Sequence, residues 1–189
     1  MDNIVEKIKE EVIKKSNIYE EKYNFNFWDE HVKYVVANSI DLAKRYNADI
    51  EIVQLGALLH DMAMISEYGT REEHHIYGEK LAEELLTQLQ YPKDKIEKVK
   101  KCVLNHRGSV NNKKDSIEEM CVADADVVAH FDAIPSLFEC AYGEKKRLST
   151  QDGSNWVKGK LERDFNKLSP MSKELLKDRY ENIIKVLFR

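Results

Sequence analysis

Turn-forming residues and cysteines are scarce in this sequence. Seven glycines and three prolines among 189 residues fall well below the roughly 12 % that these two residues together average in globular proteins. This scarcity disfavours an all-β chain, which needs many Gly and Pro turns, and excludes a collagen-like composition. The three cysteines lie far apart and form no CxxC pair, so we expect Cys102, Cys121 and Cys140 to be reduced residues in helices of the core.

Long hydrophobic runs and an excess of positive charge are also missing. The longest apolar stretch, Ile52 to Ile65, contains Gln54, His60 and Asp61 and is shorter than the roughly 20 residues of a membrane helix. The first residues contain no signal-peptide core. Thirty basic against 34 acidic residues give a net charge of −4, which argues against a duplex nucleic-acid binder. We therefore expect a cytoplasmic protein with a small-molecule partner and with no membrane or duplex nucleic-acid partner.

Helical periodicity is the dominant pattern of the sequence. Apolar residues recur every three or four positions along nearly the whole chain, which predicts an all-α fold of about eight or nine helices. We expect a single domain over 1–189, with its core at about 28–140 and a C-terminal helical hairpin at about 152–188. One helix is predicted from about Asp49 to Met64, and a break is predicted at Gln151 to Ser154.

The predicted helix that ends near Met64 carries the most informative residues. It is apolar on nearly all sides, which is typical of a buried helix, and Asp61 is the one charged residue between Glu51 and Glu67. Burying an ionised carboxylate is costly unless it is paired or binds a metal. The adjacent His60 would serve as a second ligand. A neutral His60 beside a hydrogen-bonded Asp61 is the alternative if this doublet stood alone.

Further histidines also fall on apolar helix faces. His31 lies on the face of Trp28 and Val35, and His106 follows the face of Val99 and Val103. One such histidine is more often an ordinary core residue than a ligand. Several of them together with buried aspartates suit first-row transition metals, because these ions prefer imidazole and carboxylate ligands.

The order of these residues resembles that of the HD superfamily of metal-dependent phosphohydrolases. His31 is followed by the doublet His60-Asp61, preceded by Gly-Ala-Leu-Leu, and later by an Ala-Asp pair; the resemblance covers about residues 28–140. It implies an HD-type helical domain in which His31, His60, Asp61 and the distal aspartate bind Mn, Fe, Co, Ni or Zn, with Mg also possible. It further implies hydrolysis of a small phosphorylated metabolite, most simply a nucleotide, by metal-activated water; the phosphate linkage is left open.

The distal aspartate has two candidates, Asp124 and Asp126. In the family the Ala-Asp pair is followed two residues later by an apolar residue, which is Val128 if Asp126 is the ligand. Residues two apart on a helix point about 200° apart, so both cannot meet one metal. We therefore predict Asp126 as the ligand. We expect Asp124 to orient a ligand histidine or to face the pocket, and His130, one turn after Asp126, to orient a ligand, with an ordinary core or surface histidine as the alternative.

Three more histidines, His74, His75 and His106, fall between the doublet and the distal aspartate. Their order resembles the dinuclear subgroups of the superfamily, with Asp61 as the bridge between two metals. In the alternative, a single metal is bound and these histidines bind substrate phosphate or move protons. Arg107 is the leading candidate for binding substrate phosphate. Asp61 and His106 are the candidate catalytic residues, with His75 or His106 able to donate the leaving-group proton if not a ligand.

Two other functions share this residue order. The order also resembles that of the diiron oxygenases built on the same fold, whose metals activate dioxygen instead of water. A non-catalytic nucleotide sensor that retains its metal is the second alternative. Oxygen uptake would indicate the first, and nucleotide binding without turnover the second.

Overall fold

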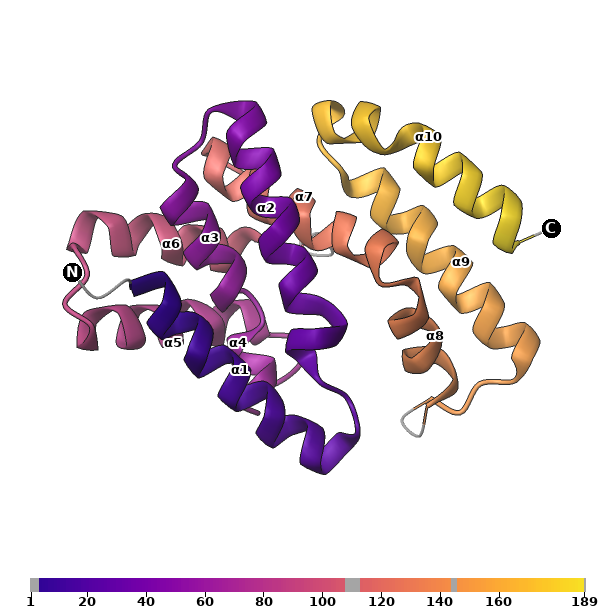
Figure 1. Ribbon diagram of the computed structural model, residues 1–189, viewed down its shortest axis with the longest axis horizontal. Helices are drawn as coiled ribbons and strands as arrows, with labels where there is room; N and C mark the ends of the chain where they lie inside the picture. Colours follow the sequence, from indigo (N-terminus) through magenta and orange to yellow (C-terminus); the bar gives the residue numbers. More distant parts are fainter. Residues whose placement is uncertain (1–3, 108–112, 144–145, 189) are drawn as a thin grey trace.

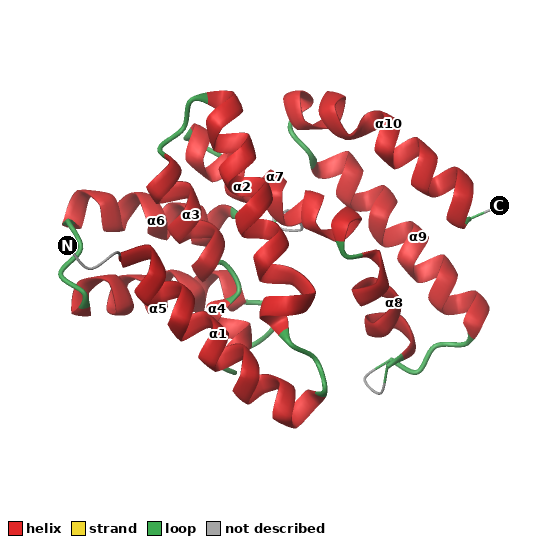
Figure 2. Cartoon of the chain, viewed as in Figure 1, coloured by secondary structure: helices red, strands yellow, loops and turns green. Residues whose placement is uncertain are grey.

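Helices make up the regular structure of the chain (Figure 2). The computed structural model describes residues 4–107, 113–143 and 146–188, and this part of the chain contains no strand. The predicted all-α fold is confirmed. In chain order the elements are α1 (Ile4–Tyr23), the π-helix η1 (Trp28–Val32), α2 (Lys33–Tyr46), α3 (Ile50–Leu59), α4 (Met62–Ile65), α5 (His74–Gln88), α6 (Lys93–Asn105), α7 (Ile117–Asp132), α8 (Ile134–Tyr142), α9 (Thr150–Lys167) and α10 (Pro170–Leu187).

Helix α7 lies between two groups of helices (Figure 1). Its Val122, Ala125 and Ala129 belong to a large apolar cluster shared with α1–α6. Its Val127 and Phe131 belong to a smaller cluster shared with α8, α9 and α10. The same helix therefore buries two faces and joins the C-terminal helices to the main core.

Helix α3 forms the centre of the main core. Seven of its ten residues are buried, as its continuous apolar sequence predicts. Gly56 allows a close approach to α6, because a Cβ atom at this position would lie 2.7 Å from the Cβ of Cys102. The reduced cysteines Cys102 and Cys121 are buried here, and Cys140 is partly buried.

The chain breaks at the His60-Asp61 doublet, where an unbroken helix from Asp49 to Met64 is predicted. That prediction is wrong: α3 ends at Leu59, and Asp61 has φ −106° and ψ 12° before α4 begins. Within a regular helix, neighbouring side chains point about 100° apart. The break removes this constraint, and a carboxylate oxygen of Asp61 lies 3.4 Å from Nε2 of His60.

The C-terminal hairpin consists of α9 and α10. The predicted break at Gln151 to Ser154 is wrong, because these residues form the first turn of α9, where Ser149 accepts a hydrogen bond from the backbone N–H of Asp152. Gly153 is a packing residue: a Cβ atom there would lie 2.1 Å from Tyr142. Gly153 therefore allows α9 to pack closely and does not mark a turn.

Among the described residues, no helix is both long and apolar enough to cross a membrane.

Candidate metal centre

The break after α3 directs both residues of the doublet towards one buried centre. His60 is fully buried and Asp61 is 8 % exposed. Nδ1 of His60 lies 2.7 Å from the carbonyl oxygen of Ala57, a group left free by the end of α3. A carbonyl can only accept, so Nδ1 carries the proton and Nε2 is the free ligand atom.

The first ligand group consists of His31, His60 and Asp126. These residues come from η1, from the end of α3 and from α7. Nε2 of His31 lies 3.1 Å from Nε2 of His60 and 3.1 Å from a carboxylate oxygen of Asp126. The π-turn that carries His31 is not distinguishable from an α-helix by apolar spacing, and such turns are frequent at functional sites.

The second ligand group consists of Asp61, His74 and His106. His74 is the first residue of α5, and His106 follows the last residue of α6. Nδ1 of His74 donates to the carbonyl group of Arg71, and Nδ1 of His106 donates to that of Val103, both at 2.6 Å. Both imidazoles therefore present Nε2 to the centre, and the two Nε2 atoms are 3.1 Å apart.

The carboxylate of Asp61 faces the histidines of both groups. Its Oδ2 is 3.4 Å from Nε2 of His60 and 3.8 Å from Nε2 of His31. Its Oδ1 is 3.3 Å from Nε2 of His74 and 3.9 Å from Nε2 of His106. One oxygen thus faces each group, which is the arrangement of a bridging carboxylate.

The donor set of the second group fits a cation. When each imidazole carries its proton on Nδ1 alone, the Nε2 atoms of His74 and His106 are two acceptors facing each other. At metal–nitrogen distances of about 2.0–2.1 Å, two nitrogens bound to one ion at tetrahedral to right angles lie about 3 Å apart, close to the observed separation. A shared metal ion explains the contact without an unpaired buried acceptor.

The pKa values of the centre follow from burial and from the two carboxylates. Burial alone would raise the pKa of Asp61 and of Asp126, but His60 beside Asp61 and the hydrogen bond from His31 to Asp126 hold both pKa values well below their usual range. Burial acts to lower the pKa of His60, but Asp61 outweighs it and raises that pKa to about 9. For His106, burial and then repulsion from His60 lower the pKa to about 4. Negative charge is therefore fixed at the centre.

His130 lies directly behind a residue of the first group. Its ring stacks on that of His31, with centroids 5.2 Å apart and planes at 16°. Its Nδ1 lies 3.1 Å from a carboxylate oxygen of Asp164 and 3.3 Å from the ammonium of Lys160. His130 thus contacts a ligand candidate through its ring, and its role in orienting that ligand stays a prediction.

His75 does not join either group. It is 6 % exposed, and its ring centroid is 5.8 Å from that of His74. Among the described residues, its buried Nδ1 has no hydrogen-bond partner. Of the two adjacent histidines, the structure therefore brings His74, and not His75, to the centre.

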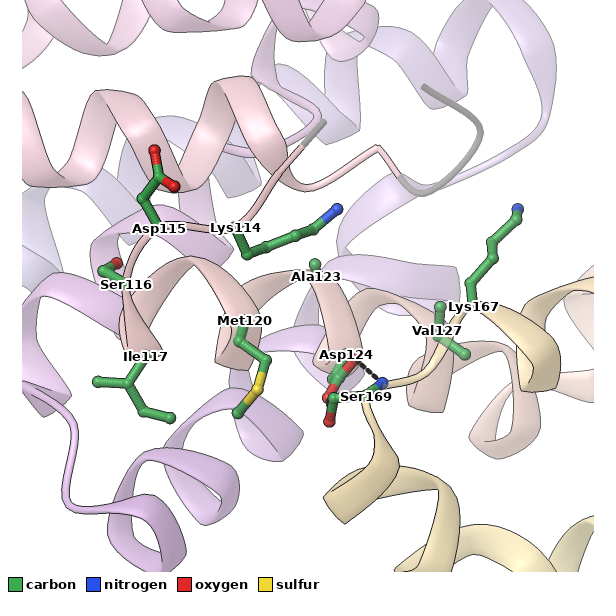
Figure 3. A pocket seen from close by; sticks show the side chains of 10 residues that line it. All are labelled: Lys114, Asp115, Ser116, Ile117, Met120, Ala123, Asp124, Val127, Lys167 and Ser169. Atoms are coloured by element: carbon green, nitrogen blue, oxygen red, sulfur yellow. Dashed lines mark hydrogen bonds between the residues drawn. The ribbon is translucent and has the colours of Figure 1, made fainter. Parts of the chain in front are cut away.

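Asp124 does not support a ligand histidine. Figure 3 shows its carboxylate beside Ser169, at the start of α10. It accepts a 3.0 Å hydrogen bond from the backbone N–H of Ser169 and a second from the hydroxyl group. Both residues line a separate pocket of about 350 Å³. Asp124 faces away from Asp126, as the 200° relation requires, and ties α7 to the C-terminal hairpin.

The centre opens into a large cavity with basic side chains on its wall. The cavity has a volume of about 980 Å³ and is lined by Asp61 and by Arg107. Arg107 also donates to the carbonyl group of Glu72, which fixes the guanidinium near α5. Sequence reasoning missed Arg71, which lines the same cavity; its position three residues before His74 was the available signal.

The fold and the site together define an all-α protein with two adjacent, largely buried His/Asp groups that could hold metal. The sequence model of the HD domain matches residues 28–130, more than half of the chain. The chain belongs to the HD domain family, which confirms the resemblance drawn from its sequence. A comparison with the curated proteins finds no match.

Solved structures share the fold of this chain. A predicted HD superfamily hydrolase from an uncultured Thermotogales bacterium is 19 % identical, with a TM-score of 0.62 over 95 % of this chain and 87 % of that chain. YpgQ from Bacillus subtilis is 18 % identical, with a TM-score of 0.72 over 97 % and 91 %. YpgQ in complex with ADP is 19 % identical, with a TM-score of 0.68 over 96 % and 92 %. At these identities the likeness concerns the fold.

Proposed function

We propose that this protein is a metal-dependent phosphohydrolase with a two-metal centre that acts on a small phosphorylated metabolite, most simply a nucleotide. The observation that carries the proposal is the carboxylate of Asp61. Each of its oxygens faces one group of histidines, at the wall of a cavity that also contains guanidinium groups. Two adjacent metal ions are a recurring arrangement for phosphate hydrolysis.

The dimensions and charges of the cavity support a nucleotide-sized substrate. Its volume of about 980 Å³ is at the upper end of the roughly 300–1,000 Å³ typical of small-molecule sites. Arg71 and Arg107 both line it, and the planar fork of arginine suits phosphate oxygens. A protein of the same fold, YpgQ, has been solved in complex with ADP, which supports the choice of a nucleotide.

The residues of the centre would bind the two metal ions in two sets. His31, His60 and Asp126 would bind one metal, and His74 and His106 the other, with Asp61 shared. When bound, such ions lower the pKa of water and polarise a phosphoryl oxygen.

The side chains around the centre would orient the substrate. Arg107, fixed by the carbonyl group of Glu72, and Arg71 would hold the phosphate and stabilise its negative charge as the bond to the leaving group breaks. Because Nε2 of His106 faces the second group, we assign His106 as a ligand and not as the proton donor.

The test is phosphate release from a nucleotide panel. Protein purified under low oxygen is supplied with Mn, Co, Ni, Fe or Mg, and orthophosphate and pyrophosphate are measured alongside Asp61→Ala as the control. We expect release from at least one nucleotide by the native protein and none by the variant. Nucleotide binding without release under every metal would instead identify a sensor.

The two-metal geometry also favours a second candidate, an HD-type diiron oxygenase. Carboxylate-bridged iron pairs in helical proteins use similar ligands, so the centre alone does not separate the two reactions. The guanidinium groups in the cavity favour a phosphorylated substrate in either case. Two irons per chain with oxygen uptake and no phosphate release would identify the oxygenase.

A further inference from the structure

Helix α9 contributes to the cavity although it lies outside the segment matched by the HD domain. That segment ends at His130, whereas α9 spans Thr150–Lys167. Lys160, Asp164 and Lys167 all line the cavity and are spaced by four and three residues, so they share one face of the helix. The sequence analysis assigned no function to this face.

Asp164 is the buried member of this group. Its side chain is 2 % exposed, whereas those of Lys160 and Lys167 are 25 % and 29 % exposed. Its Oδ2 accepts from Lys160 at 2.5 Å, and its Oδ1 accepts from Lys167 at 3.2 Å. Nδ1 of His130 is also 3.1 Å from Oδ2. The carboxylate is thus held beneath two ammonium groups that reach the cavity.

The charges of this group do not cancel. One carboxylate, with its pKa at about 2 because the hydrogen bond from His130 and the charge of Lys160 outweigh burial, is paired with two lysines. One lysine would suffice to neutralise a buried carboxylate. The second ammonium leaves this group of three residues with a net positive charge, which suits an anionic ligand. Elsewhere the cavity wall also carries carboxylates, among them Glu30 and Glu139, so the positive charge is local to this face of α9.

Lys160 contacts a residue that stacks on the metal centre. Its ammonium lies 3.3 Å from Nδ1 of His130, whose ring stacks on the ring of His31. One histidine ring therefore separates Lys160 from a residue of the first ligand group. An ammonium has three N–H donors, and its bond to Asp164 uses one of them.

We propose that Lys160 binds a phosphate group of the substrate in the cavity, and that Asp164 is the positioning residue that holds its ammonium in place. This inference rests on the proposed function for its ligand class and adds a second source of positive charge, on α9, to the arginines near α5. Substrate phosphate would then be bound from two sides of the cavity. The specificity of the site would depend on a helix outside the matched segment.

The experiment measures binding by calorimetry, with the Mn-loaded protein and two probes. The first probe is the α,β-methylene analogue of ADP, which resists hydrolysis, and the second is adenosine, which lacks phosphate. A hydrogen bond to a charged group changes binding affinity about tenfold or more. We therefore expect Lys160→Gln to weaken binding of the analogue about tenfold or more. Adenosine binding and metal content should not change.

Two variants on the same helix provide matched controls. Lys158→Gln removes an equal charge from a residue that does not line the cavity and should leave both affinities unchanged. Lys160→Arg keeps the charge and should recover part of the lost affinity. Equal binding of the analogue by the native protein and Lys160→Gln would overturn the inference, whatever the outcome of the hydrolysis assay.

The positioning role of Asp164 is tested by a double-mutant cycle. Asp164→Asn should weaken binding of the analogue, and combining it with Lys160→Gln should cause little further loss, because the two residues act as one unit. Additive losses would contradict the positioning role. A native protein that binds the analogue no better than adenosine would overturn the phosphate site itself, even if another substrate is hydrolysed.

Discussion

The two ligand groups of the centre are built in different ways. In the second group, the backbone orients both histidines, because Nδ1 of His74 and Nδ1 of His106 donate to carbonyl groups. In the first group, the backbone orients His60, through the carbonyl group of Ala57, whereas His31 packs against the ring of His130 and contacts Asp126. The first group contains its own carboxylate, Asp126. It also faces one oxygen of Asp61.

This difference teaches where each group is sensitive to substitution. Carbonyl groups at helix ends cannot be removed by changing a side chain, so the second group should respond mainly to loss of its own ligands. The first group depends on α7 and, through His130, on Asp164 of α9. Changes in the C-terminal helices should therefore affect the first group selectively.

Removal of the shared carboxylate should weaken metal binding in both groups. Asp61→Ala deletes the oxygen that faces each set of histidines, so we expect loss of metal from both groups. Turnover should fall by more than about 100-fold, which is the largest loss typical for residues that only support metal ligands. Elemental analysis and phosphate release test this together. Native metal content and turnover in this variant would refute the shared role of Asp61.

Removal of one histidine from each group should separate them. His31→Ala should lower metal content by one ion per chain and leave the second group able to bind its ion through His74 and His106. His106→Ala should do the reverse. Metal titration of both variants in parallel checks the assignment, and loss of all metal from only one of them would indicate a single-metal centre with extra histidines.

Substitution behind the first group should give a smaller and selective effect. His130→Ala removes the ring stacked on His31, and residues that orient ligands typically contribute about 10–100-fold to metal affinity. We expect the affinity of the first group to fall by about tenfold and that of the second to stay unchanged. His130→Phe keeps a stacking ring and should recover much of the loss; an equal effect on both groups would contradict the comparison.

Removal of a guanidinium from the cavity should affect substrate and not metal. Arg107→Ala deletes a charged donor, so we expect KM for a phosphorylated substrate to rise about tenfold or more, with metal content intact. Steady-state kinetics and elemental analysis measure the two effects. Unchanged KM would remove Arg107 from the substrate site.

Removal of a carboxylate remote from both groups should leave the centre as it is. Asp124→Ala deletes two hydrogen bonds from Ser169, and bonds to a charged group contribute about 1.5–3 kcal/mol each. We expect a lower free energy of unfolding in denaturant titrations and native metal content. Ser169→Ala removes one of the two bonds and should cost less. Metal loss in Asp124→Ala would indicate that Asp124 contributes to metal binding.

Much of the fold could be predicted from local patterns in the sequence. Apolar spacing indicates the helices, and the single charged residue between Glu51 and Glu67 indicates the doublet. The break at His60-Asp61 could not be predicted, because the residues around it are good helix formers and the tertiary contacts of the doublet decide the local geometry. The helical start of α9 was missed because Gly153 serves packing against Tyr142, a contact between distant elements.

The ligand candidates could be found in the sequence, but their grouping could not. His74 and His75 are adjacent and point about 100° apart on α5, so the choice depends on which face packs against the core. Gly78, one turn after His74, lets α5 approach α6: a Cβ there would lie 3.0 Å from Cγ1 of Val103. Lys160 and Asp164 meet His130 only through packing of α9 on α7.

The most direct test of the account is a titration of the metal-free protein with Mn²⁺, followed by electron paramagnetic resonance under low oxygen. A carboxylate shared by two ions should couple their electron spins. We predict binding of two ions per chain, with the six-line signal of isolated Mn²⁺ replaced by that of a coupled pair, and loss of the coupled signal in His106→Ala. Saturation at one ion per chain, or two ions without coupling, would contradict the two-metal centre bridged by Asp61.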